Sequence, residues 1–177
     1  MTNNKLNLLN AIESLNSATD NFIRDLSFST PDFLETQIEN QNLDVSGVYF
    51  IEIRSEKYLD GCPNDWKEKF VTFWDKAEFK GKFTPQSKKK RLNAHDSVGE
   101  WTPLYIGKCK NIRKRLNDHK TLTFFQKTRG IKLDARGIYE QDSFRVSHVE
   151  IPLDVYDEIS EKIESYYRNE INPLVGI

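Results

Sequence analysis

Hydrophobic residues recur with a helical period at both ends of the chain. Near the N-terminus the pattern predicts a helix from about Lys5 to Leu26, and near the C-terminus it predicts a helix that opens at Pro152. The apolar residues that carry these two patterns are Leu8, Ile12, Leu15, Phe22 and Leu26, then Val155, Ile159 and Ile163.

Two further helices are predicted in the first half of the chain. Thr30-Pro31-Asp32 combines a capping hydroxyl, a proline suited to the first helical position and an acid in the first turn, and it predicts a helix to about Asn40. Residues 63–79 carry an aromatic stripe at helical spacing, which is more typical of a packing surface than of a base-stacking platform. That stripe consists of Trp66, Phe70, Phe73 and Trp74.

Three segments are rich in β-branched and aromatic residues and predict strands: 47–53, 103–106 (ending at Gly107) and 144–151. A helix from about Asn111 to His119 follows the second strand. Helices that alternate with few strands indicate a small α/β or α+β domain, with a mixed or antiparallel central sheet flanked by helices. Residues 80–100 show no periodicity and are predicted to form a basic loop.

The net charge of -1, from 26 Lys plus Arg and 27 Asp plus Glu, by itself disfavours a nucleic-acid partner. The charge is unevenly distributed, however. Residues 80–136 contain 16 bases and four acids, a net charge of +12, and the remaining residues carry -13. This asymmetry favours a basic surface. Mixing of the segments into a neutral surface on folding is the alternative.

Other function classes find no support in the sequence. No apolar run is long enough to span a membrane, and no signal-peptide pattern begins the chain, so a cytoplasmic protein is expected. Cys62 and Cys109 lack the spacing of a zinc site or a disulfide framework and are expected to be free thiols.

One set of polar residues has the chemistry needed around a phosphodiester. Arg115 and His119 are four residues apart and share a helix face, where a guanidinium can hold phosphate beside an imidazole. Glu164 is a carboxylate able to hold Mg²⁺ or Mn²⁺ together with waters and substrate phosphate. A tyrosine can act as a base if nearby cations lower its pKa. Each residue alone is more often part of a solvated face.

The order of these residues resembles the GIY-YIG nuclease family. Gly47-Val48-Tyr49 is similar to the family's first motif, and Tyr105-Ile106-Gly107 reproduces the second. Arg115 stands eight residues after Gly107, as the family's arginine does, with His119 one turn later. Glu164 precedes Pro173 by nine residues, as the family's metal-binding glutamate does.

The sequence departs from the family pattern in two places. The tyrosine motifs are usually joined by a short hairpin, so an insertion at about 54–100 must be looped out. Gly176 stands where the family often has Asn, and Asn172 is not assigned that role. Gly137-Ile138-Tyr139 spells the first motif but follows the second, and it is interpreted as a coincidence.

The resemblance implies a GIY-YIG-like domain at 45–177, preceded by a helical extension at 1–44. It implies an endonuclease that uses one Mg²⁺ or Mn²⁺ and is most like the restriction-enzyme branch. Tyr49 would be the base or would position water, Tyr105 and His119 would support it, Arg115 would bind phosphate, and Glu164 would hold the metal. A repair nuclease, an RNA-cleaving toxin and an inactive nucleic-acid-binding module remain alternatives.

Double-stranded DNA is the expected partner. Its phosphates would be bound by basic residues after the second motif and in the insertion, although solvated lysines are the alternative. These candidates are Lys108, Lys110, Lys88, Lys89, Lys90 and Arg91. A homodimer is also considered, formed through the first helix or through the aromatic helix at 63–79.

Overall fold

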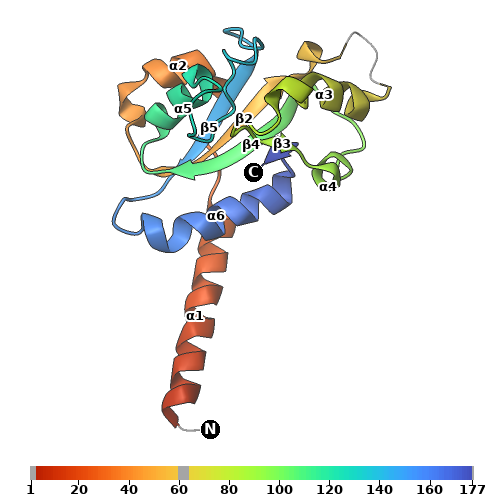
Figure 1. Cartoon of the computed structure of the whole chain (residues 1–177). Helices are drawn as coiled ribbons and strands as arrows, with labels where there is room; N and C mark the ends of the chain where they lie inside the picture. The colour runs from red at the N-terminus through yellow and green to blue at the C-terminus, as the bar shows by residue number, and fades with distance from the viewer. Residues whose placement is uncertain (1–2, 60–63, 177) are drawn as a thin grey trace.

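The computed structural model describes residues 3–59 and 64–176 (Figure 1). Its centre is a four-stranded sheet with the order β1-β5-β2-β4, in which every neighbouring pair is antiparallel. The strands are β1 (Asp32–Phe33), β2 (Gly47–Arg54), β4 (Trp101–Cys109) and β5 (Phe144–Glu150). The predicted α+β class with an antiparallel sheet is confirmed.

Helices cover both faces of this sheet. The helices α2 (Leu34–Glu39) and α5 (Ile112–Thr121) lie on one side, and α6 (Tyr156–Ile171) lies on the other (Figure 1). Alternation along β2 explains the two cores, because Tyr49 and Ile51 face the first layer while Val48 faces α6. A short 3₁₀ turn, Gln41–Leu43, connects α2 to β2.

The N-terminal helix α1 (Asn3–Asp25) projects away from the sheet (Figure 1). It contacts α6 towards its C-terminal end, where Ile23 is buried and Lys162 donates a hydrogen bond to Asn16 Oδ1 at 2.9 Å. Its predicted apolar stripe stays in solvent, with Leu15 66% exposed. The first helix thus forms where the sequence predicts it. Leu8, Ile12, Leu15 and Phe22 of its stripe are exposed, whereas Leu26, just beyond the helix, packs against the core on the α6 side of the sheet.

The segment after α1 differs from the prediction. The helix expected to begin at Thr30 begins at Leu34, because Asp32 and Phe33 pair with β5 instead. Leu34 and Leu43 are buried in the main core. Residues 32–43, predicted as part of a helical extension, are therefore integral to the sheet and its core.

Residues 55–100 occupy the place of a hairpin turn. β2 and β4 pair along their lengths as far as Arg54 and Trp101, so the intervening chain leaves and returns at one end of the sheet. Its elements are the 3₁₀ turns Ser55–Lys57 and Ala77–Phe79, α3 (Trp66–Trp74), β3 (Gln86–Ser87) and α4 (Lys89–Leu92).

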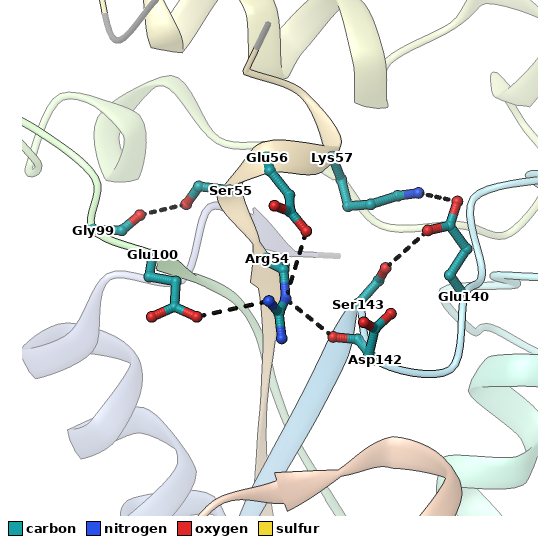
Figure 2. Close-up of polar contacts among 9 residues, drawn as sticks. All are labelled: Arg54, Ser55, Glu56, Lys57, Gly99, Glu100, Glu140, Asp142 and Ser143. Carbon is teal, nitrogen blue, oxygen red and sulfur yellow. Dashed lines mark hydrogen bonds and ion pairs between the residues drawn. The ribbon is translucent and has the colours of Figure 1, made fainter. Parts of the chain in front are cut away.

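A polar network closes the base of this insertion (Figure 2). Ser55 donates from Oγ to the carbonyl of Gly99 at 2.6 Å, and Arg54 lies 3.8 Å from the carboxylate of Glu100. Arg54 Nε also donates to the carbonyl of Asp142 at 3.2 Å, which connects the insertion to the loop before β5. Lys57 pairs with Glu140 on that same loop. These contacts fix the insertion at its exit from the sheet.

Within the insertion, α3 is shorter than the predicted 63–79, and Trp66, Phe70 and Trp74 are buried in the main core. The predicted packing role of the stripe is confirmed, and the burial removes it as a dimer surface. The expected basic loop at 80–100 is wrong in part, because it contains β3 and α4. β3 pairs with the C-terminal strand β6 (Val175–Gly176), which supplies backbone partners that sequence periodicity does not reveal.

Candidate active site

Tyr49 and Tyr105 come together on one face of the sheet. Tyr49 on β2 lies directly opposite Gly107 on β4, and Tyr105 stands two residues before Gly107, on the same face. The two rings have centroids 6.2 Å apart. A Cβ atom at Gly107 would lie 2.4 Å from the Tyr49 hydroxyl, so only glycine leaves room for that phenol. The glycine of the second motif therefore has a packing role.

His119 on α5 is fully buried and completes this group. Its Nε2 lies 2.7 Å from the Tyr49 hydroxyl, and its Nδ1 accepts a hydrogen bond from the backbone N–H of Ile131 at 3.0 Å. Because Nδ1 is an acceptor, the proton of the neutral ring is on Nε2. His119 therefore donates to the Tyr49 oxygen.

Arg115 reaches the same tyrosines from one turn earlier on α5. The Asn111 side chain caps this helix by accepting from the Lys114 N–H at 2.8 Å, and buried Ile112 seats it on the core. Arg115 donates from Nη1 to the carbonyl of Arg129 at 2.8 Å. Its positive charge acts on Tyr49, Tyr105 and His119.

Burial dominates the protonation of this group. It raises the pKa of Tyr49 well above its ordinary value, and Arg115 opposes that rise. Burial, with a smaller effect of Arg115, lowers the pKa of His119 well below its ordinary value. At neutral pH Tyr49 is thus a phenol, and His119 is neutral, in agreement with the bond that its Nδ1 accepts from Ile131.

Burial raises the pKa of Tyr105, and the charge of Glu164 on α6 adds a smaller rise. Glu164 is only 8% exposed, and Arg168 Nη2 lies 3.0 Å from its Oε1. Burial raises the pKa of Glu164, while Arg168 and Lys108 lower it. Since β4 is the edge strand, α6 can place this carboxylate near Tyr105 from the other face of the sheet.

The donors near Glu164 suit a cation only in part. Among the described residues no group of three or more His, Cys, Asp or Glu side chains could hold a metal ion. Arg168 pairs with Oε1 of Glu164, so Oε2 is the oxygen that could face a cation. One carboxylate fits Mg²⁺ when water and substrate phosphate supply the other ligands.

Lys108 and Lys110 both interact with α6. Lys108 Nζ lies 3.5 Å from Ser160 Oγ, and Lys110 Nζ lies 2.7 Å from Asp157 Oδ2. The strand β4 continues past its predicted end at Gly107 to Cys109, so Lys108 is a strand residue. These contacts put both lysines beside the helix that bears Glu164.

The basic run of the insertion forms α4, where Lys89 and Lys90 are exposed and Lys88 is half-buried. Arg91 points inward and donates from Nη1 to the carbonyls of Pro173 and Val175, at 3.3 and 3.1 Å. A Cβ at Gly176 would lie 2.8 Å from this Nη1. Arg91 therefore fills the space that a side chain at 176, the position of the expected Asn, would need.

Sequence reasoning missed Arg168 and Ile131. Arg168 follows Glu164 by four residues, a helical pairing that spacing alone suggests. Its buried Nε has no hydrogen-bond partner within the described chain. Ile131 contributes only a backbone N–H, for which a sequence carries no signal.

Gly137-Ile138-Tyr139 lies outside the sheet, with Gly137 in a turn at φ 66° and the Tyr139 hydroxyl on Glu35. Cys109 is a free thiol whose pKa burial raises to about 11, and Cys62 lies outside the described residues. In the part of the chain described, no helix is long and apolar enough to cross a membrane.

Comparisons with protein-family models, curated proteins and solved structures find no match for this chain.

Proposed function

We propose that this protein is a metal-dependent endonuclease that hydrolyses DNA phosphodiester bonds in the manner of a type II restriction enzyme. The observation that carries the proposal is the hydrogen-bonded group of Tyr49 and His119 beside Arg115. The buried imidazole of His119 and the half-buried guanidinium of Arg115 both act on the buried Tyr49 hydroxyl, and a packing role alone does not require that chemistry.

Each residue has a distinct part in the proposed reaction. Arg115 exchanges the carbonyl of Arg129 for a phosphate oxygen and neutralises the charge that develops on it. Tyr49 positions the attacking water or, once ionised, accepts its proton. The Nε2–H of His119 stabilises negative charge on the Tyr49 oxygen. Water forms the new bond to phosphorus as the bond to the leaving oxygen breaks. The proton that the water loses passes to Tyr49 or to solvent, and the leaving oxygen takes a proton from solvent.

The proposed cofactor is one Mg²⁺ or Mn²⁺ ion held by Glu164. When bound, the ion supplies positive charge that stabilises the leaving oxygen. Arg168 keeps the Glu164 carboxylate in place through Oε1. Lys108, close enough to lower the pKa of Glu164, adds positive charge on the same side.

A homodimer formed through α1 is part of this proposal, because one active site cuts one strand at a time. The positions of its largely apolar stripe alternate by steps of four and three, the heptad pattern of a coiled coil. They are Leu8, Ile12, Leu15, Thr19 and Phe22. Charges of both signs are spread along the helix, so no like-charge block opposes a second copy. At 1.5 Å per residue the helix offers a seam of about 35 Å.

The test is cleavage of plasmid DNA and of single-stranded RNA in Mg²⁺ or EDTA. Discrete metal-dependent DNA fragments are expected from the wild type. They should be lost in Arg115→Ala and Glu164→Ala but kept in Arg113→Ala, at a residue of α5 with an exposed ion pair, and in Glu158→Ala, at an exposed residue of α6.

The other outcomes separate the alternatives. Nicking confined to branched or damaged DNA would indicate a repair nuclease, and cleavage of RNA alone would indicate a toxin. The burial of Tyr49 favours one further candidate, an inactive module. DNA binding without cleavage under any metal condition would establish that candidate and overturn the enzyme proposal.

A further inference from the structure

Two segments without acidic residues meet beside the candidate active site. Residues 79–95 and 119–133 contain no Asp or Glu, although together they carry ten Lys and Arg residues. The backbone N–H of Gly130 donates to the carbonyl of Phe83 at 3.2 Å. The buried Lys132 donates from Nζ to the carbonyl of Lys82 at 2.9 Å. These bonds join the insertion to the loop that follows α5.

A fixed turn in that loop holds Phe125 in solvent. The N–H of Gln126 donates to the carbonyl of Thr123 at 3.2 Å, and the Gln126 side chain accepts from the Thr123 N–H at 2.7 Å. Lys132 Nζ also donates to the Gln126 carbonyl at 2.7 Å. Phe124 stacks on Phe79 at 5.1 Å, whereas Phe125 is 95% exposed. The hydrogen-bonded turn thus holds the Phe125 side chain in solvent, where that side chain has no packing role.

Basic residues accompany Phe125. We define the Phe125 surface by five residues: Lys82, Phe83, Phe125, Lys127 and Arg129. All five are exposed. The surface is continuous with the candidate site, because the carbonyl of Arg129 accepts from Arg115 at 2.8 Å and the N–H of Ile131 donates to His119.

We infer that the Phe125 surface binds nucleic acid, with its three cations on backbone phosphates and Phe125 stacked on an exposed base. Aromatic stacking on bases combined with a basic backbone track is the usual means of binding splayed-out or single-stranded nucleotides. A protein partner fits less well, because lysine is depleted in protein interfaces. The inference deepens the proposed function and rests on its substrate class.

Binding can be measured without cleavage, in EDTA, with oligonucleotides that carry 2-aminopurine, both single-stranded and as duplexes. Fluorescence anisotropy reports affinity, and the 2-aminopurine emission reports stacking. We expect Phe125→Ala to weaken binding about 5- to 150-fold and to abolish the change in emission. Phe125→Trp should retain both. Leu153→Ala, which removes another exposed apolar side chain (63% exposed), is the matched control and should bind as the wild type does.

The contribution of the basic residues of the Phe125 surface is measured by the salt dependence of the affinity. Lys127→Ala should reduce the slope of log affinity against log salt by about 0.7 to 0.9, because one phosphate is no longer neutralised. A Phe125→Ala protein that binds like the wild type, or an equal loss in Leu153→Ala, would overturn the inference. If Phe125 matters for binding but no substrate is cleaved, the inference stands and the nuclease proposal fails. If DNA is cleaved and Phe125→Ala binds normally, the reverse holds.

Discussion

His119 donates a hydrogen bond to Tyr49 across 2.7 Å, and the backbone N–H of Ile131 decides the direction of that bond by occupying the other ring nitrogen. A histidine held in this way cannot take a proton from the tyrosine through Nε2. Its contribution is to stabilise negative charge on the phenol oxygen, so within the proposed reaction it is a positioning residue for Tyr49.

The direction of this bond predicts the behaviour of two substitutions at 119. The amide nitrogen of Gln can take the place of Nε2 and donate without titrating, so His119→Gln should retain more cleavage activity than His119→Ala. The measurement is the single-turnover rate under saturating metal. Equal losses in the two variants would show that the imidazole is needed as a base.

The Tyr49 hydroxyl is predicted to be essential for cleavage. Tyr49→Phe keeps the ring over Gly107 but removes the oxygen, and it should lower the cleavage rate by about 10²- to 10⁴-fold. Tyr58→Phe is the matched control, because it removes another buried hydroxyl, one bonded to Thr102 at 2.6 Å. Tyr49→Phe should lose about 1–3 kcal/mol of stability, since the Nε2–H of His119 is left without its acceptor. Tyr58→Phe should lose less, because Thr102 Oγ1 keeps its hydrogen bond to Ser55. Loss of cleavage in both would show that the effect at 49 is one of folding.

Burial of neutral His119 predicts a pH-dependent stability. Its pKa is lowered in the folded state, so below the unfolded value of about 6.5 the unfolded chain binds more protons. Stability is therefore complete above that pH and falls as the pH drops, by about 1.4 kcal/mol per pH unit for this group. Denaturant unfolding at pH 5 to 8 should show a steeper loss for the wild type than for His119→Gln. Parallel curves would contradict the burial of a neutral ring.

The close approach of Tyr49 to Gly107 predicts that alanine is harmful at Gly107 and harmless at Gly99. Gly107→Ala places a methyl group 2.4 Å from the phenol oxygen and should displace Tyr49 from His119. We expect a loss of about 1–3 kcal/mol in stability, with loss of cleavage. Gly99→Ala meets nothing within 4 Å and should change neither property. Thermal unfolding and the plasmid assay measure the two effects. Full activity in Gly107→Ala would mean that the position of Tyr49 is irrelevant.

The heptad stripe of α1 predicts that dimerisation is lost when charge enters the seam. The wild type should have twice the 20.7 kDa chain mass by light scattering, and the double variant Ile12→Glu, Leu15→Glu should have the mass of one chain. Asn10→Glu adds a charge on the opposite face of the same helix and should remain dimeric. A wild type that is monomeric at high concentration would refute the coiled-coil interface.

The local pattern of the sequence determined most of the elements. The long helices α1 and α6 were predictable from their hydrophobic periods, and the strands β2 and β5 from their β-branched and aromatic residues. The i, i+4 spacing of Arg115 and His119 predicted that they share a helix face, and the structure places both against Tyr49.

Only the tertiary structure decided the features that depend on chain segments far apart in sequence. Asp32 and Phe33 form a strand because β5 offers an open edge, and β3 exists because the C-terminus pairs with it. Arg91 belongs to a basic run in the sequence, but the carbonyls of Pro173 and Val175 draw it inward. The tautomer of His119 follows from one backbone N–H twelve residues away. Such partners are set by long-range hydrogen bonds and burial, which no local period encodes.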